Sequence, residues 1–85
     1  MTDSVTVTAT AVWPDDAEDV AAGVVANWFV RVGAAVDEGE TICEIQVEKV
    51  SVDIPAPAAG TLAEVLVEEN EEFERDAPLA VIDPA

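Results

Sequence analysis

Apolar and polar residues alternate along most of the chain, and this alternation predicts β-strands. Valine, isoleucine and threonine dominate the alternating runs, and Gly, Pro, Asp and Asn separate them. The runs are SVTVTATAV (4–12), VVANWFVRV (24–32), TICEIQV (41–47), VSVDI (50–54), TLAEVLVE (61–68) and LAVID (79–83). Segment 16–22 suggests one short helical turn, and the acidic segment 68–75 is expected to be a loop. Many short strands at close spacing predict an all-β sandwich or flattened barrel.

The second half of the chain repeats the first. Aligning Gly23 with Gly60, an offset of 37 residues, superposes apolar positions throughout: Val25 on Leu62, Trp28 on Val65, Phe29 on Leu66, Val36 on Phe73, Ile42 on Leu79 and Ile45 on Ile82. Turn positions also coincide, because Gly33 meets Asn70 and Gly39 meets Asp76. Gly, Asn and Asp best tolerate a positive φ, so the same turns are expected in both copies. We therefore predict two copies of one β unit.

The connection between the copies, QVEKVSVDIPAP (46–57), holds the only lysine of the chain, Lys49. If strands 41–47 and 50–54 pair as a hairpin, its turn centres on Glu48 and Lys49. A two-residue hairpin turn usually has Asn-Gly or a related pair, so turn geometry alone does not explain these residues. Lys49 could simply be an exposed charge that offsets acidic neighbours. It is also the sole side-chain primary amine, at an exposed tip where an enzyme could attach a group through an amide bond.

Composition limits the possible functions. The chain has 85 residues, enough for one small domain. It has 19 Asp and Glu residues against 3 Lys and Arg residues, for a net charge of -16, which disfavours nucleic acid and anionic membranes as partners. No basic start or long apolar segment suggests export or membrane insertion, so a cytoplasmic location is expected. Such an acidic surface also suggests a halophilic source.

Few residues could carry chemistry of their own. The chain has no His, and the acidic run 68–72 lacks the spacing of a calcium loop, so neither a catalytic residue nor a metal site is expected. Cys43 is alone, which excludes an internal disulfide. It aligns with Ala80 in the repeat, and a small buried residue is therefore expected there.

The chain resembles the lipoyl domains of 2-oxoacid dehydrogenase complexes, within the biotinyl/lipoyl attachment family, over nearly all of residues 1–85, read as one domain. An acidic-Lys-apolar motif at a hairpin tip is matched by Glu48, Lys49 and Val50. An upstream Leu-x-Glu-Ile pattern is matched by residues 42–45, a downstream Pro-x-x-Gly by residues 57–60, and an early Trp by Trp28. The resemblance implies two four-stranded antiparallel sheets related by a pseudo-twofold axis, with the attachment turn at one end.

The resemblance also implies a function. Lys49 would carry lipoic acid in amide linkage, with Glu48 and Val50 recognised as its flanks. The chain would be a carrier and not an enzyme. The implied partners are a lipoate ligase or lipoyl transferase, a thiamin-diphosphate 2-oxoacid dehydrogenase component, an acyltransferase component and dihydrolipoamide dehydrogenase.

Two other functions fit the same fold. Biotin carboxyl carrier domains usually place Met on both sides of the lysine, whereas here Lys49 lies between Glu48 and Val50, which favours lipoylation. An unmodified structural adaptor is the third possibility, and the acidic-Lys-apolar tip argues against it.

The net charge of -16 predicts that salt stabilises the fold, because screening weakens the repulsion among carboxylates. The urea midpoint of unfolding should therefore rise as KCl is increased. A midpoint that stays constant or falls with KCl would remove the case for adaptation to a salt-rich cell.

Overall fold

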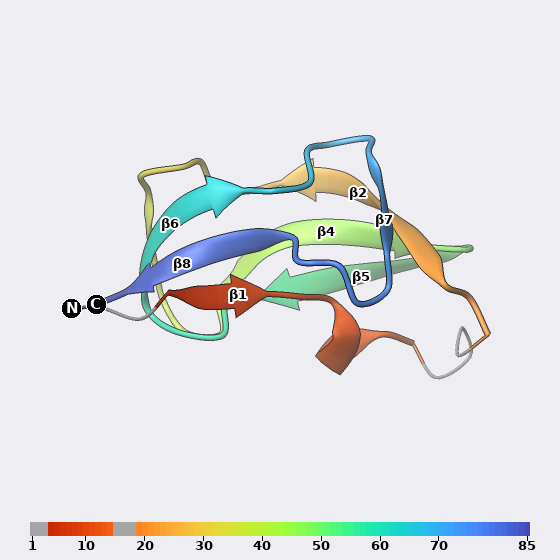
Figure 1. Ribbon diagram of the computed structural model, residues 1–85, viewed down its shortest axis with the longest axis horizontal. Helices are drawn as coiled ribbons and strands as arrows, with labels where there is room; N and C mark the ends of the chain where they lie inside the picture. Colours follow the sequence, from red (N-terminus) through yellow and green to blue (C-terminus); the bar gives the residue numbers. More distant parts are fainter. Residues whose placement is uncertain (1–3, 15–18) are drawn as a thin grey trace.

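A computed structural model describes residues 4–14 and 19–85 (Figure 1). Over these residues the elements are β1 (Val5–Val7), a 3-10 turn η1 (Thr10–Val12), β2 (Ala22–Trp28), β3 (Ala35–Val36), β4 (Thr41–Val47), β5 (Val50–Pro55), β6 (Gly60–Val65), β7 (Glu72–Glu74) and β8 (Ala80–Pro84). They form two four-stranded antiparallel sheets, ordered β1-β8-β6-β3 and β5-β4-β2-β7. The predicted all-β architecture is confirmed.

The molecule is elongated, with extents of 38 × 20 × 18 Å. The start of β1 and the end of β8 lie together at one end, and the β4–β5 hairpin projects at the other (Figure 1). None of the helical structure in the described part of the chain is long and apolar enough to span a membrane.

The pseudo-twofold symmetry that the family resemblance implied is present in the strand order. The offset of 37 residues brings β2 onto β6, β3 onto β7 and β4 onto β8, and each pair occupies equivalent places in the two sheets. Even an irregularity repeats: the register of β2 against β4 shifts between Val25 and Asn27, and that of β6 against β8 shifts between Leu62 and Glu64. The two copies therefore share a bulge as well as a strand order.

The core lies between the sheets and is built from repeat-related pairs. Fully buried side chains include Val25 with Leu62, Ile42 with Leu79, and Ile45 with Ile82. No charged or polar side chain is buried among the described residues. Of the two adjacent aromatic residues at the end of β2, Trp28 packs half-buried against the core, while Phe29 remains 56% exposed.

Each copy completes the backbone hydrogen bonding of the other. The turn after β2 donates from Gly33 N to Leu62 O over 2.8 Å, and Leu62 N donates back to Ala34 O over 2.9 Å. The symmetry-related turn after β6 donates from Asn70 N to Val25 O over 2.7 Å, and Val25 N donates to Glu71 O over 3.1 Å. Gly33 and Asn70 both have a positive φ, of 95° and 71°, as predicted from their alignment.

Some strands are shorter than the alternating runs predicted. Run 4–12 yields a strand only at Val5–Val7, because β8 offers partners only from Ile82 to Ala80. The chain then bends through η1, which brings Ala9 and Trp13 into the core. The strands formed by runs 24–32 and 61–68 likewise end early, at Trp28 and at Val65. There the chain turns toward the opposite copy.

Three further expectations need correction. Segment 68–75 is not all loop, since it contains β7, and its equivalent β3 was not predicted either. Both strands are too short to show an alternating pattern. Asp76 does not share the positive φ of Gly39, so that pair of turns differs. The helical turn expected at 16–22 falls partly on residues 15–18, outside the described residues, and Ala22 already belongs to β2.

The left-handed turn at Asn70 gives a stability prediction. An alanine there would hold a positive φ at a cost of about 1–2 kcal/mol, whereas glycine adopts it freely. Asn70→Ala should therefore lower the free energy of unfolding by about that amount, and Asn70→Gly should change it little. Chemical denaturation measures both, and equal stabilities of the two variants would contradict this role for the turn.

Candidate functional site

The predicted hairpin is present, and it carries the lysine at its tip. β4 and β5 pair antiparallel, and the last partners before the turn are Val47 and Val50. Glu48 and Lys49 are thus the two residues of the turn. Val47 is fully buried, so β4 is anchored in the core up to the turn, whereas Val50 at the start of β5 is 40% exposed. The tip is held by packing immediately behind it.

The backbone of the turn is unusual at Glu48, which has φ of 59°. Lys49 does not share the positive φ, so the signs match those of a type II′ hairpin turn. Glycine is the usual residue at the first central position of that turn, because a Cβ is disfavoured there. A left-handed non-glycine residue costs roughly 1–2 kcal/mol. The turn therefore contains a strained residue, Glu48, directly beside Lys49.

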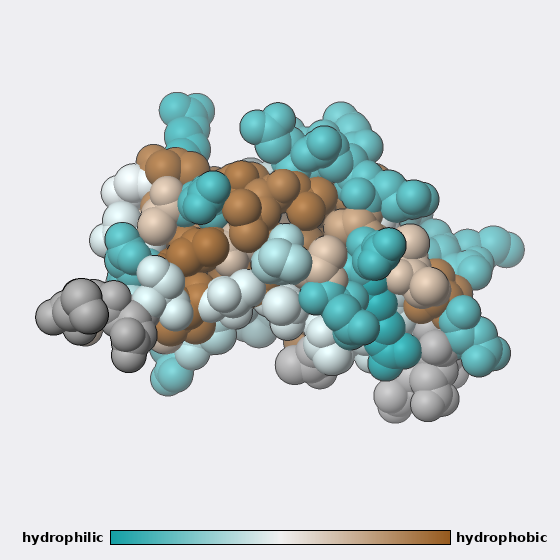
Figure 2. Space-filling view, viewed as in Figure 1, coloured by the Kyte–Doolittle hydropathy of each residue, from teal (hydrophilic) through white to brown (hydrophobic). Residues whose placement is uncertain are grey.

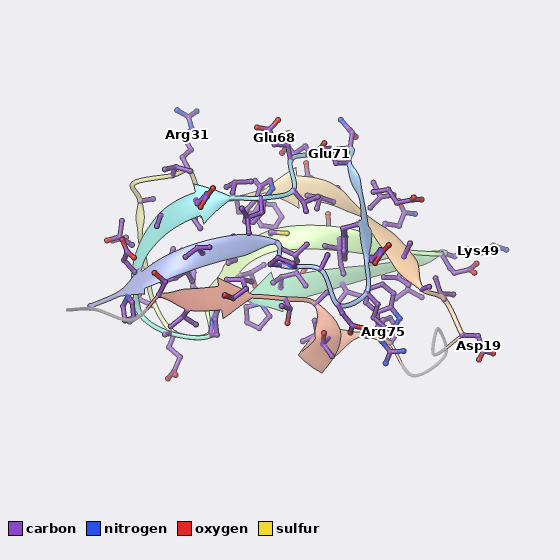
Figure 3. All side chains as sticks on the ribbon, viewed as in Figure 1. Asp19, Arg31, Lys49, Glu68, Glu71 and Arg75 are labelled. Atoms are coloured by element: carbon purple, nitrogen blue, oxygen red, sulfur yellow. The ribbon has the colours of Figure 1, made fainter. Side chains whose placement is uncertain are left out.

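The lysine lies at one extreme of the molecule. Its side chain is exposed and points outward from the end of the hairpin (Figure 3). Glu48 is also exposed, and together with Val50 it forms the immediate surroundings of the amine. The three residues that the sequence predicted at this site are consecutive in the chain, and all three are exposed. An amine placed in this way is accessible to a second protein from several directions.

The other motif residues lie away from the tip and have structural roles. Residues 42–45 belong to β4, and Ile42, Cys43 and Ile45 are fully buried. Gly60 begins β6, where a Cβ would overlap the carbonyl of Asp83, so only glycine fits. These motifs therefore support the frame that positions the hairpin and do not contribute to the site itself.

The burial of one aromatic residue, Trp13, was not predicted from the sequence. Trp13 is buried, and its ring meets Phe73 edge-on with centroids 6.2 Å apart. Arg75 lies 5.7 Å from the centroid of the same ring and donates from its backbone N to Ala21 O over 2.8 Å. The contacts fix the chain on both sides of residues 15–18 against β7. Trp13 has no counterpart in the repeat, so the alignment gave no indication of its burial.

Cys43 is buried and chemically quiet, as expected. Its side chain is fully buried in β4. Burial, with a smaller effect from the negative charge of Glu44, raises the pKa of the Cys43 thiol to about 12. Because the thiolate is the reactive form, the folded protein offers almost none at neutral pH. A disulfide carried elsewhere on this domain would not meet a competing thiol from its own core.

Sequence comparison places the chain among small attachment domains. The profile of the family described as biotin-requiring enzyme matches residues 10–82. The dihydrolipoyllysine-residue succinyltransferase component of the 2-oxoglutarate dehydrogenase complex of Staphylococcus saprophyticus is 38% identical over 69 residues, or 81% of this chain and 16% of that protein. The dihydrolipoyllysine-residue acetyltransferase component of the pyruvate dehydrogenase complex of Staphylococcus aureus is 41% identical over 57 residues, or 67% of this chain and 13% of that protein. The chain thus spans under a fifth of these relatives.

Solved structures agree on the fold. The lipoyl domain of the 2-oxoglutarate dehydrogenase complex of Azotobacter vinelandii superposes with a TM-score of 0.66 and 25% identity, covering 96% of this chain and 98% of that domain. A single-chain, multi-domain long-chain acyl-CoA carboxylase superposes with a TM-score of 0.77 at 21% identity, over 96% of this chain and 7% of that one. This second likeness concerns the fold alone. With the profile matching most of its length and an exposed lysine at the hairpin tip, the chain belongs to the biotinyl/lipoyl attachment family.

Proposed function

We propose that this chain is a lipoyl carrier domain and that Lys49 is its attachment residue. The main support is the position of Lys49: it is the sole lysine, and it is exposed at the tip of a hairpin that is anchored in the core. The relatives of this chain named above are dihydrolipoyllysine-residue acyltransferase components. The domain would present the modified lysine to enzymes that carry out the catalysis.

The attached group supplies a cyclic disulfide that can accept an acyl group and be reduced to a dithiol. The chain's own residues would hold and present it. Amide formation at Lys49 removes a positive charge, and the tip then carries only the negative charge of Glu48. The buried thiol of Cys43 cannot exchange with the disulfide while the domain is folded. The domain would therefore deliver the group without reacting with it.

The relatives support the partners that we infer. As these relatives belong to 2-oxoglutarate and pyruvate dehydrogenase complexes, we infer a thiamin-diphosphate dehydrogenase component, an acyltransferase component and dihydrolipoamide dehydrogenase as partners of this chain. A lipoate ligase or lipoyl transferase would modify Lys49. The exposed carboxylate of Glu48 and the exposed apolar surface of Val50 flank the amine and would be read by that enzyme.

A biotin carboxyl carrier is the second candidate, because the family profile is described by biotin-requiring enzymes and the fold also occurs in an acyl-CoA carboxylase. The flanks Glu48 and Val50, with no Met beside Lys49, favour lipoylation.

Replacing the lysine should separate folding from function. Lys49→Arg changes an exposed turn residue, so stability should stay within about 0.5 kcal/mol. The guanidinium cannot accept the group, so lipoylation in vitro and acyl transfer in a reconstituted complex should both be lost. As a control, adding Arg31→Lys to Lys49→Arg places the only lysine at another exposed position, and this variant should also remain unmodified. Modification of the control would show that the tip does not define the site.

Glu48 is expected to strain the turn and also to contribute to recognition by the lipoylating enzyme. Glu48→Gly removes the strained Cβ and should raise the free energy of unfolding by up to about 1 kcal/mol. Glu48→Gln keeps the strain and should leave stability unchanged. Because both variants lose the carboxylate, both should be lipoylated more slowly than the wild type. Wild-type lipoylation rates for Glu48→Gln would contradict a role for the charge.

A further inference from the structure

A shallow groove lies on the pseudo-twofold axis, where the segments that follow β2 and β6 meet. Its volume is about 680 Å³, and Trp28, Val30, Val32 and Val65 form its apolar lining. Apolar surface is visible between the projecting side chains of Arg31 and Glu68 (Figures 2 and 3). The groove therefore combines an apolar floor with charged and polar residues at its edges.

Among the apolar residues that line the groove, Trp28, Val30 and Val65 pack partly buried against the core, whereas Val32 does not. Val32 is 59% exposed, and neither it nor Phe29 belongs to the buried cluster or packs against it. Leu66, the repeat equivalent of Phe29, is likewise 41% exposed and outside the cluster. Exposed apolar surface that gathers in one place marks an interaction site more often than isolated residues do. Phe29 and Leu66 adjoin lining residues along the chain but do not themselves line the groove, so Val32 is its exposed apolar residue.

The floor of the groove is already formed. The indole of Trp28 donates from Nε1 to Val67 O over 2.9 Å, which fixes the ring against the segment after β6. The backbone N of Trp28 donates to Glu69 Oε2 over 2.9 Å, which holds that carboxylate at the rim. A partner would thus bind without having to order the floor, and binding is stronger when the surface is preorganised.

The charged residues at the rim make the two ends of the groove differ in charge. Arg31 and Glu68 occupy equivalent positions in the two repeats, so the symmetry axis relates a cation to an anion. Glu69 adds a second carboxylate on the Glu68 side. An occupant that follows the groove would therefore meet positive charge at one end and negative charge at the other. The net charge of -16 on each chain disfavours a second copy as the occupant.

We propose that this groove docks a segment of another protein that inserts an apolar side chain between the rims. The segment would place Lys or Arg beside Glu68 and Glu69, and Asp or Glu toward Arg31. Lys49 lies at the far end of the molecule (Figure 3), so the partner would hold the domain while the tip stays free. The proposal does not depend on the identity of the group attached to Lys49.

Selection from a displayed library of short random peptides tests the groove. Enriched peptides should combine a large apolar residue with a basic residue on one side and an acidic residue on the other. An enriched peptide, made synthetically, is then titrated into nitrogen-15-labelled domain and followed by amide chemical shifts. Val32→Asn should weaken its binding about tenfold, as expected for loss of an apolar anchor contact. Val50→Asn, which changes an exposed valine at the tip, is the matched control and should bind like the wild type.

A charge exchange provides the sharpest readout. The double variant Arg31→Glu with Glu68→Arg keeps the net charge, and it should reverse the order of acidic and basic residues among the selected peptides. Amide spectra and urea midpoints like those of the wild type would show that each variant is folded. The proposal is overturned if no peptide is enriched, if Val32→Asn binds as well as the wild type, or if the charge exchange leaves the selected order unchanged. Self-association of the domain that Val32→Asn abolishes would assign the groove to a second copy and also overturn it.

Discussion

The fold depends on an exchange of backbone hydrogen bonds between its two halves. The turn at Gly33 bonds to Leu62 of the second half, and the turn at Asn70 bonds to Val25 of the first. Val25 and Leu62 are also fully buried and adjoin the bulges of β2 and β6. Neither half can satisfy its buried backbone groups alone, and leaving such groups unpaired is costly. The two copies must therefore fold together, and their relative position is fixed.

The arrangement of the two halves determines the geometry of the hairpin that carries Lys49. β4 is a central strand, paired with β2 on one side and with the edge strand β5 on the other, so one strand of the hairpin is held on both sides. Packing of Val47 holds β4 up to the turn, which allows the left-handed backbone of Glu48 to persist. Strained residues persist where the surrounding structure determines their conformation, and they are concentrated at functional sites. The amine of Lys49 is thus presented from a rigid support and reaches outward from one end of the molecule.

The repeat made much of this predictable from the sequence. Aligned apolar residues such as Ile42 and Leu79 coincide with positions that the structure buries, and the Gly33–Asn70 match identified the shared turn. Strand ends were not predictable from alternation, because they depend on where partner strands stop, as at Val7. β3 and β7 were too short to produce a pattern. The positive φ of Glu48 gave no signal, since glutamate is not a residue that indicates such a turn. The groove also had no local signature, because its walls come from segments that the symmetry brings together.

The central claim is that Lys49 carries a lipoyl group, and the intact mass of the protein purified from its own host tests it most directly. The account predicts the mass of one lipoyl amide, mapped by peptide analysis to Lys49 and not to the N-terminal amine. A biotinyl mass at Lys49 would instead make the domain a carboxyl carrier on the same fold. An unmodified chain, from cells whose other lipoyl proteins are fully lipoylated, would contradict the carrier function altogether.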